Sequence, residues 1–176
     1  MNLRLLPIGL LLTLCNTSLV YARDSLAVAS HSAQSTKTQS QHNIDSLAIT
    51  APDMDGAKVA CERTIEGTAV LPSGAHLWIL AHRTDGFEDV WWPQNEARVD
   101  PVTRIWKVNV TFGGIQDIGK EFEIAATIVD ETQHMQLRNH RKDALKTGKW
   151  LPIDMPIVLR PPVIRRVMKA SHDGCS

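Results

Sequence analysis

The four residues from Trp91 to Gln94 read Trp-Trp-Pro-Gln and are the local feature best suited to binding chemistry. Neighbouring residues of a strand face opposite sides, so at most one of the two indoles belongs to the core of a half-buried sheet. The other indole either packs under the inserted helix expected below, the interpretation we favour, or forms an exposed platform that stacks on a sugar ring or an aromatic partner. The candidate ligand-binding residues are Trp91, Trp92, Gln94 and the neighbouring Asp89.

Acidic residues surround the tryptophan pair, and calcium binding is the first chemistry they suggest: Asp85, Glu88, Asp89, Glu96 and Asp100. Calcium takes about six to eight oxygen ligands, and the spacing of these carboxylates does not reproduce a known calcium loop. Two carboxylates about 5 to 10 Å apart across a cleft would instead suit hydrolysis of a polysaccharide. We favour solvated loop charge over both interpretations.

Metal-ligand spacing is not found among the histidines of the predicted domain. Four of the five form two pairs six residues apart, His76 with His82 and His134 with His140. The first pair lies at the two ends of one expected strand, and the second lies on different faces of an expected helix. Zinc sites use spacings such as i, i+2 or i, i+4, so we predict no metal ligand.

The sequence contains no motif for nucleophilic catalysis. Ser73 has His76 close to it in sequence, but no nucleophile elbow surrounds Ser73 or Ser171, and two neighbouring residues do not make a triad. No nucleotide-binding loop is present. We therefore predict no catalytic residue and no cofactor.

The C-terminal third is basic and predicts a docking face at Arg138, Arg141, Lys142 and Lys146. Residues 131–176 hold 9 bases and 4 acids, whereas residues 51–130 hold 7 bases and 13 acids. Such a face would dock on an acidic polysaccharide, anionic lipid headgroups or an acidic protein surface. The alternative, which we favour, is that these cations complement the helix dipole and pair with the acidic half of the domain.

Cys61 and Cys175 are the two cysteines left when the leader is removed, and we favour a disulfide between them. The closed loop would exceed 100 residues and contribute roughly 4 kcal/mol in the chain-entropy model. The alternative is a buried Cys61 with a free thiol at Cys175, available for intermolecular pairing.

Period-two alternation predicts a mostly β fold. Every second residue from Trp106 to Phe112 is apolar, and a residue such as Gly67 inside a strand predicts a bulge or a change of sheet. Residues 76–83 are apolar on both faces, which predicts a central strand covered on both sides. The expected strands are residues 59–70, 76–83, 104–112, 121–130, 155–160 and 163–170.

One amphipathic helix is expected at about residues 131–147. Asp130 and Gln133 resemble a capping box, and Gly148 is a typical C-terminal stop. Several short strands separated by turn residues favour an immunoglobulin-like sandwich. The predicted fold is therefore an all-β, antiparallel β-sandwich of immunoglobulin-like type with one inserted surface helix.

The order of several short segments is also familiar: Ile-Glu-Gly-Thr at 65–68, Pro-Ser-Gly-Ala-His-Leu-Trp at 72–78, Trp-Trp-Pro-Gln at 91–94, Trp106, Ile-Gly-Lys-Glu-Phe at 118–122 and Val-Asp at 129–130. This pattern resembles an uncharacterised, immunoglobulin-like β-sandwich domain that recurs in bacterial exported and multidomain proteins. The resemblance covers about residues 51–170. It implies a fold and a location, and because the family has no agreed activity it carries over no catalytic residue.

Residues 1–22 are predicted to be a secretory signal peptide. Arg4 supplies the positive charge, an apolar run follows, and Val20-Tyr21-Ala22 offers small residues at the cleavage site. The apolar run is shorter than the roughly 20 residues that span a bilayer, and no later stretch predicts a transmembrane helix. Cys15 suggests a lipid anchor, but Leu14 stands where that signal normally has a small residue. We favour a periplasmic or secreted protein.

Residues 23–50 are predicted to be a disordered polar linker, because the run from 30 to 43 carries no large apolar residue. His31 and His42 lie there, and we interpret them as linker composition rather than as a metal site. The β-sandwich domain is predicted to span residues 51–176.

The 19 basic residues equal the 19 acidic residues in number, which argues against a nucleic-acid partner. The favoured function is that of an exported, non-catalytic binding or interaction module of the bacterial cell envelope, with a protein or glycan partner. The alternatives are a structural component of an envelope assembly and a small enzyme that acts on polysaccharide.

Overall fold

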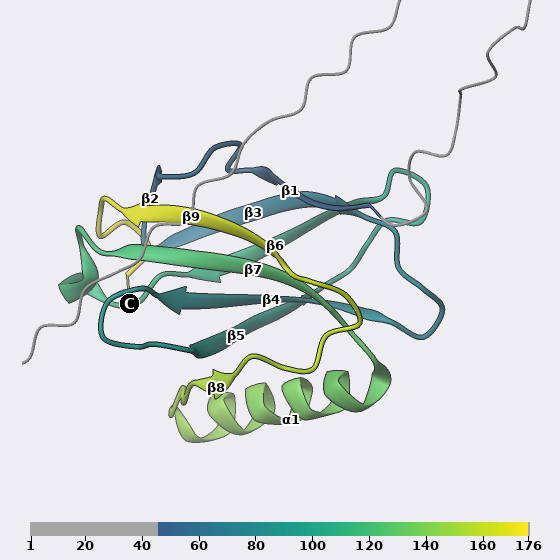
Figure 1. The fold of residues 1–176 in the computed structure, drawn as a ribbon. Helices are drawn as coiled ribbons and strands as arrows, with labels where there is room; N and C mark the ends of the chain where they lie inside the picture. Colours follow the sequence, from purple (N-terminus) through teal and green to yellow (C-terminus); the bar gives the residue numbers. More distant parts are fainter. Residues whose placement is uncertain (1–45, 176) are drawn as a thin grey trace, which may run out of the picture. The chain divides into compact units, whose positions relative to one another are not determined.

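The structure, a computed structural model, describes residues 46–175 and is drawn in Figure 1. The predicted signal peptide, Cys15 and most of the predicted linker lie outside the described residues. The elements are β1 (Leu47–Ala51), β2 (Ala57–Val59), β3 (Glu62–Ala69), β4 (His76–Arg83), β5 (Val90–Ala97), β6 (Ile105–Thr111), the short 3-10 helix η1 (Ile115–Asp117), β7 (Glu121–Val129), α1 (Glu131–Thr147), β8 (Ile153–Asp154) and β9 (Val163–Lys169).

The strands form two sheets, and the helix is inserted between β7 and β8. The three-stranded sheet has the order β1-β3-β6, and the six-stranded sheet has the order β2-β9-β7-β4-β5-β8. Pairing is antiparallel except between β2 and β9, which run parallel. The predicted mostly β fold with one helix over residues 131–147 is confirmed.

Four parts of the strand prediction differ from the structure. β5 (Val90–Ala97), which pairs with β4, is not among the expected strands. β1 begins at Leu47, inside the segment assigned to the linker, because the Leu-Ala-Ile-Thr run buries Ile49 and pairs with β3. The strand expected at 155–160 is displaced to Ile153–Asp154, where it pairs with β5. The segment expected to be one strand from residue 59 divides into β2 and β3.

The main core lies between the two sheets. Alternation along β6 buries Trp106, Val108 and Val110, while the residues between them are exposed. β4 contributes Leu77 and Ile79 to the same core from the other sheet. Burying these large side chains supplies the principal free energy that holds the two sheets together.

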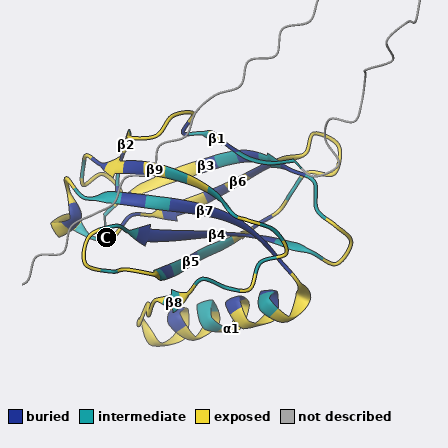
Figure 2. Ribbon diagram, viewed as in Figure 1, coloured by how far each residue is buried: buried dark blue, intermediate teal, exposed yellow. Residues whose placement is uncertain are grey.

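A second apolar cluster lies on the opposite face of β4, beneath α1. Trp78 and Leu80 pack there with Trp91 of β5 and Leu137 of the helix. The predicted central strand is therefore covered on both faces, by the first core on one side and by α1 on the other. Figure 2 shows the buried stripe of α1 turned toward the sheet and its other faces exposed.

The helix ends where the sequence predicts. The Asp130 side chain accepts a hydrogen bond of 2.8 Å from the backbone N–H of Gln133, which satisfies one of the free donors of the first turn. Gly148 adopts the left-handed conformation with φ of 70°, which a glycine occupies without steric cost. These caps fix which helical residues face the sheet.

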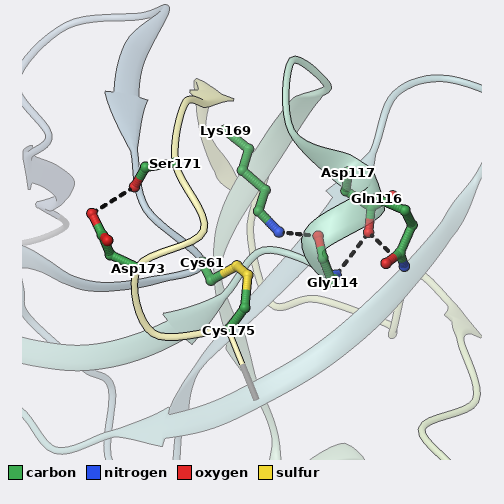
Figure 3. Close-up of a disulfide and its surroundings, with 8 residues drawn as sticks. All are labelled: Cys61, Gly114, Gln116, Asp117, Lys169, Ser171, Asp173 and Cys175. Atoms are coloured by element: carbon green, nitrogen blue, oxygen red, sulfur yellow. Dashed lines mark hydrogen bonds between the residues drawn. A yellow bond between two sulfur atoms is a disulfide. The ribbon is translucent and has the colours of Figure 1, made fainter.

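The predicted disulfide joins Cys61, just before β3, to Cys175 near the chain end, with the two Cα atoms 5.1 Å apart. Close to it lies a buried polar network, shown in Figure 3, in which the ammonium of Lys169 donates to the carbonyl oxygen of Gly114. The buried carboxylate of Asp117 accepts from the backbone N–H of Gly114 at 2.8 Å and pairs with Arg83 at 2.6 Å.

The fully buried Lys169 makes stability depend on alkaline pH. Burial lowers its pKa below the ordinary value of 10.5, against the opposing charge of Asp117. Below the folded-state pKa the lysine is charged in both states, and the folded state bears the full cost of burying that charge. As the pH rises above the folded-state pKa, the buried lysine loses its proton and this cost is relieved. We expect the free energy of unfolding of the wild type, relative to that of Lys169→Met, to rise as the pH increases toward the ordinary lysine pKa of 10.5. Urea denaturation measures this difference, and a difference between the two proteins that does not change with pH would contradict the expectation.

Candidate functional site

The tryptophan pair does not form an open platform. Trp91 is 8% exposed and packs against the ring of His82, with ring centroids 5.0 Å apart, in the cluster beneath α1. Trp92 is half-buried, meets Phe87 edge-on, and donates its indole N–H to the carbonyl oxygen of Trp150 at 3.2 Å. Trp91 is therefore the indole that packs beneath the helix, whereas Trp92 contacts the segment that follows the helix.

The other two residues predicted beside the pair have separate environments. Gln94 occupies an irregularity in the pairing of β5 with β4. Its side chain accepts a hydrogen bond from the backbone N–H of Thr111 at 3.0 Å and donates to the carbonyl oxygen of Trp92 at 3.2 Å. Asp89 is exposed in the loop before β5, with φ of 63°. Gln94 thus bridges β5 to β6, and Asp89 points to no partner that the structure gives.

Two of the surrounding acidic residues are engaged in local structure. Asp85 pairs with Arg83 at 2.8 Å and with Lys120, and the hydrogen bond from Lys120 is the main cause that lowers the pKa of Asp85. Asp100 accepts hydrogen bonds from the backbone N–H groups of Val102 and Thr103, which also lower the pKa of Asp100. These contacts favour the structural interpretation of the loop charges.

A cluster of histidine and glutamate side chains, not predicted from the sequence, lies where α1 begins over the sheet. His76 of β4 is hydrogen-bonded through Nδ1 to Glu96 of β5 at 2.9 Å and through Nε2 to Glu131 of α1 at 2.8 Å. The ring of His76 stacks on that of His134, with centroids 3.7 Å apart and planes 13° apart. Three elements therefore bring two imidazoles and two carboxylates together.

The two imidazoles have different electrostatic environments. Burial disfavours a charge on His76, but its hydrogen bonds to Glu96 and Glu131 outweigh burial and raise the pKa of His76. Both ring nitrogens of His76 face a carboxylate, and an imidazolium donates to both. His134 is buried, and its Nδ1 accepts the indole N–H of Trp78 at 3.1 Å. The cluster therefore stacks an imidazole that lies between two carboxylates on an imidazole that accepts a hydrogen bond from an indole.

One sequence signal points to part of this cluster. Glu131 and His134 stand three residues apart just after the predicted N-cap, and residues with that spacing are neighbours on a helix surface. His76 and Trp78 alternate on one face of β4, the face that α1 covers. The sequence did not reveal that this face and the first helical turn meet.

The predicted basic face is present on α1. Arg138, Lys142 and Lys146 recur every fourth residue, so they line one side of the helix, and all three are exposed. The guanidinium of Arg141 lies 5.4 Å from the centroid of the Trp150 ring. Lys149 follows just beyond the helix. We refer to Arg138, Arg141, Lys142, Lys146 and Lys149 as the basic face.

Within residues 46–175, no ion pair is formed by any member of the basic face. The other basic residues of this third behave differently, since Arg165 pairs with Asp55 at 3.3 Å and Arg166 with Glu123 at 2.9 Å. The sequence favoured ion pairs between these basic residues and the acidic half of the domain. The basic residues of β9 form such pairs, whereas those of the basic face do not.

Large apolar side chains stand exposed beside the basic face. Leu145 follows Arg141 by one helical turn and is 64% exposed, and Trp150 and Leu151 are 46% and 62% exposed. Residues 138–151 contain five bases and one acid, Asp143. The end of α1 and the segment after it thus combine cationic and apolar groups on the protein surface.

The described residues contain no helix that is both long and apolar enough to cross a membrane. No protein-family model and no curated protein sequence matches this chain. The resemblance to the bacterial exported β-sandwich domain therefore stays a prediction that rests on the short segments named above.

Proposed function

We propose that this protein is an exported, non-catalytic interaction module that docks on an anionic phospholipid surface through the basic face of α1 together with Leu145, Trp150 and Leu151. The observation that carries the proposal is that the five cations of the basic face form no ion pair in the described domain, although other cations of the same third do. A single-sign cluster without internal partners is suited to an external anionic surface.

A lipid surface fits the apolar residues better than a soluble polyanion does. Interfacial segments combine lysine and arginine with tryptophan and leucine, whose apolar parts enter the boundary between headgroups and acyl chains. Tryptophan prefers this boundary because its ring is amphipathic. Trp150 and Leu151 flank Lys149 in sequence. A wholly hydrophilic ligand would leave these side chains exposed to water.

The proposed fold is an immunoglobulin-like β-sandwich, and the strand order supports it. In such folds, whose strands are lettered A to G in chain order, strands A, B and E belong to one sheet and strands C, F and G to the other. Here β1, β3 and β6 form one sheet, whereas β4, β7 and β9 lie side by side in the other. The disulfide supports export, because such bonds persist in oxidising compartments.

The absence of catalysis is part of the proposal. Trp91 and Gln94 are engaged in packing and in a bridge between strands, and Asp85 and Asp100 are engaged in ion pairs and a turn. These contacts favour a structural role for the residues on which a polysaccharide-acting enzyme would depend.

Vesicle flotation tests the docking surface. The purified chain is expected to float with phosphatidylglycerol vesicles at low salt and to stay unbound with phosphatidylcholine vesicles. Replacing Lys142, Lys146 and Lys149 by Gln should weaken binding about 100-fold, since each cation near an anionic surface contributes about 1 kcal/mol. The single variant Trp150→Ala should also bind more weakly than the wild type. This loss should be the same at every salt concentration, because the contribution of Trp150 is apolar.

A matched triple variant, Lys58→Gln, Arg63→Gln and Arg98→Gln, removes the same charge from exposed positions outside α1 and should bind as the wild type does. Equal weakening by both triple variants would mean that only net charge matters and would overturn the proposal. Salt-sensitive binding to a soluble acidic polysaccharide that does not depend on Trp150, without vesicle binding, would overturn it in favour of a glycan partner.

A further inference from the structure

We propose that His76, Glu131 and His134 bind one divalent transition-metal ion of the Zn²⁺ type. The site is independent of the basic face and of the proposed docking function. It rests on side chains from two elements, the start of β4 and the first turn of α1, that meet over the outer face of the six-stranded sheet.

The candidate ligand atoms lie close to one another, and a change of side-chain rotamer would bring them around a single ion. One nitrogen of each imidazole and one carboxylate oxygen of Glu131 all lie within 4.8 Å of one another. Zinc bonds to imidazole nitrogen and carboxylate oxygen at about 2.0 to 2.2 Å, so the ligand atoms of a tetrahedral ion stand about 3.3 to 3.6 Å apart. Nε2 of His76 and the carboxylate of Glu131 are already closer than this, at 2.8 Å. Because the two ring planes are only 13° apart and imidazole lone pairs lie in the ring plane, binding requires the His134 ring to turn out of its stack on His76. Two imidazoles and a carboxylate are a donor set that suits zinc.

Glu96 provides the support that a ligating histidine normally has. Metal-bound histidines usually donate their second ring N–H to a carboxylate, which fixes the ring and raises its basicity as a ligand. His76 makes such a hydrogen bond from Nδ1 to Glu96 at 2.9 Å. Its Nε2 faces Glu131 at 2.8 Å, so an ion would take the place of the proton that lies between these two atoms.

Trp78 competes for His134. The Nδ1 lone pair of His134 receives the indole N–H of Trp78 at 3.1 Å, and this bond favours the tautomer with the proton on Nε2. Ligation by either nitrogen of His134 therefore requires Trp78 to give up the hydrogen bond. Loss of a buried hydrogen bond reduces the affinity for the ion, so Trp78 sets that affinity and its absorbance reports binding.

An ion at this position would join the helix to the sheet. His76 belongs to β4, and the two other ligands belong to the first turn of α1. A ligand that binds only the folded state raises its stability by mass action. The consequence is a domain whose resistance to unfolding increases with the supply of zinc.

Calorimetric titration of the purified, tag-free chain with Zn²⁺ at neutral to mildly alkaline pH tests the site. We expect one ion per chain, a change in tryptophan absorbance, and no binding of Mg²⁺. His76→Gln and His134→Gln should each weaken binding by more than about 100-fold. Glu96→Gln should weaken it about 10- to 100-fold, as loss of a supporting carboxylate does. Trp78→Phe should bind more tightly than the wild type.

His140→Gln is the matched control, since His140 lies on the same helix and bonds instead to the carbonyl oxygen of Leu151; it should bind as the wild type does. NMR of the wild type, in which the imidazole resonances of His76 and His134 should shift on addition of Zn²⁺, tests the ligands even where a variant fails to fold. No saturable binding, binding that survives His76→Gln and His134→Gln, or binding lost on replacing His31 and His42 would overturn the proposal.

Discussion

Replacing Cys175 by Ser is expected to lower the free energy of unfolding by about 4 to 5 kcal/mol. The Cys61–Cys175 bond closes a loop with a sequence separation of 114, and in the chain-entropy model the bond stabilises the fold by restricting the unfolded chain. A domain of this size is stable by only about 5 to 15 kcal/mol. Urea denaturation of the oxidised wild type and of the variant measures the difference.

Two controls separate the bond from the residue. Reduction of the wild type should reproduce the loss, and Cys175→Ser should be insensitive to the reductant. Ser171→Ala removes a neighbouring hydroxyl, which donates to Asp173 at 2.9 Å, and leaves the disulfide intact, so it should change stability little. A loss below about 1 kcal/mol in Cys175→Ser would contradict the loop-closure account.

Gly67→Ala is the second substitution with a large expected effect, a loss of about 3 kcal/mol or more. A Cβ at this position would lie 2.0 Å from the carbonyl oxygen of Ala48 and 2.3 Å from Cζ2 of Trp106. The first contact is with the backbone of β1, and the second is with a fully buried indole, so neither neighbour can move without loss of pairing or packing. Thermal and urea denaturation followed by circular dichroism measure the effect.

Gly114→Ala is its matched control. An added Cβ at Gly114 would also be crowded, at 2.5 Å from Oε1 of Gln116, but that atom ends a flexible, exposed side chain. The backbone of Gly114 is extended, with φ of −98°, a conformation that alanine adopts. We expect a change within about 1 kcal/mol. If both variants lost the same free energy of unfolding, the explanation from contact with immobile backbone and buried indole atoms would be wrong.

Local patterns predicted the elements well where one physical rule dominates. The alternation from Trp106 to Phe112 and the caps at Asp130 and Gly148 depend on neighbours within a few residues, so β6 and α1 could be located. Gly67 predicted a bulge in its own strand, yet β3 is continuous and the irregularity lies opposite it in β1. The glycine is required there because Trp106 passes close to its backbone.

The candidate sites depended on contacts between distant segments, which spacing does not encode. His76 is 20 residues from Glu96 and 55 from Glu131, and no motif predicts that these meet. The environment of Trp92 likewise depends on the return of Trp150, which is 58 residues away. The basic face could be predicted because the period of a helix places Arg138, Lys142 and Lys146 together, whereas the absence of ion partners in the described domain required the tertiary structure.

The bond between Cys61 and Cys175 has a consequence for survival among proteases. The polypeptide between these residues is a covalent ring that contains β3 to β9 and α1. A single backbone cut anywhere in this ring leaves both pieces attached, and strand pairs across the cut continue to hold them in register. A protease can therefore cleave an exposed connection, such as the one after Gly148, once without releasing a fragment. The two pieces of the cleaved molecule could separate only after the disulfide is reduced.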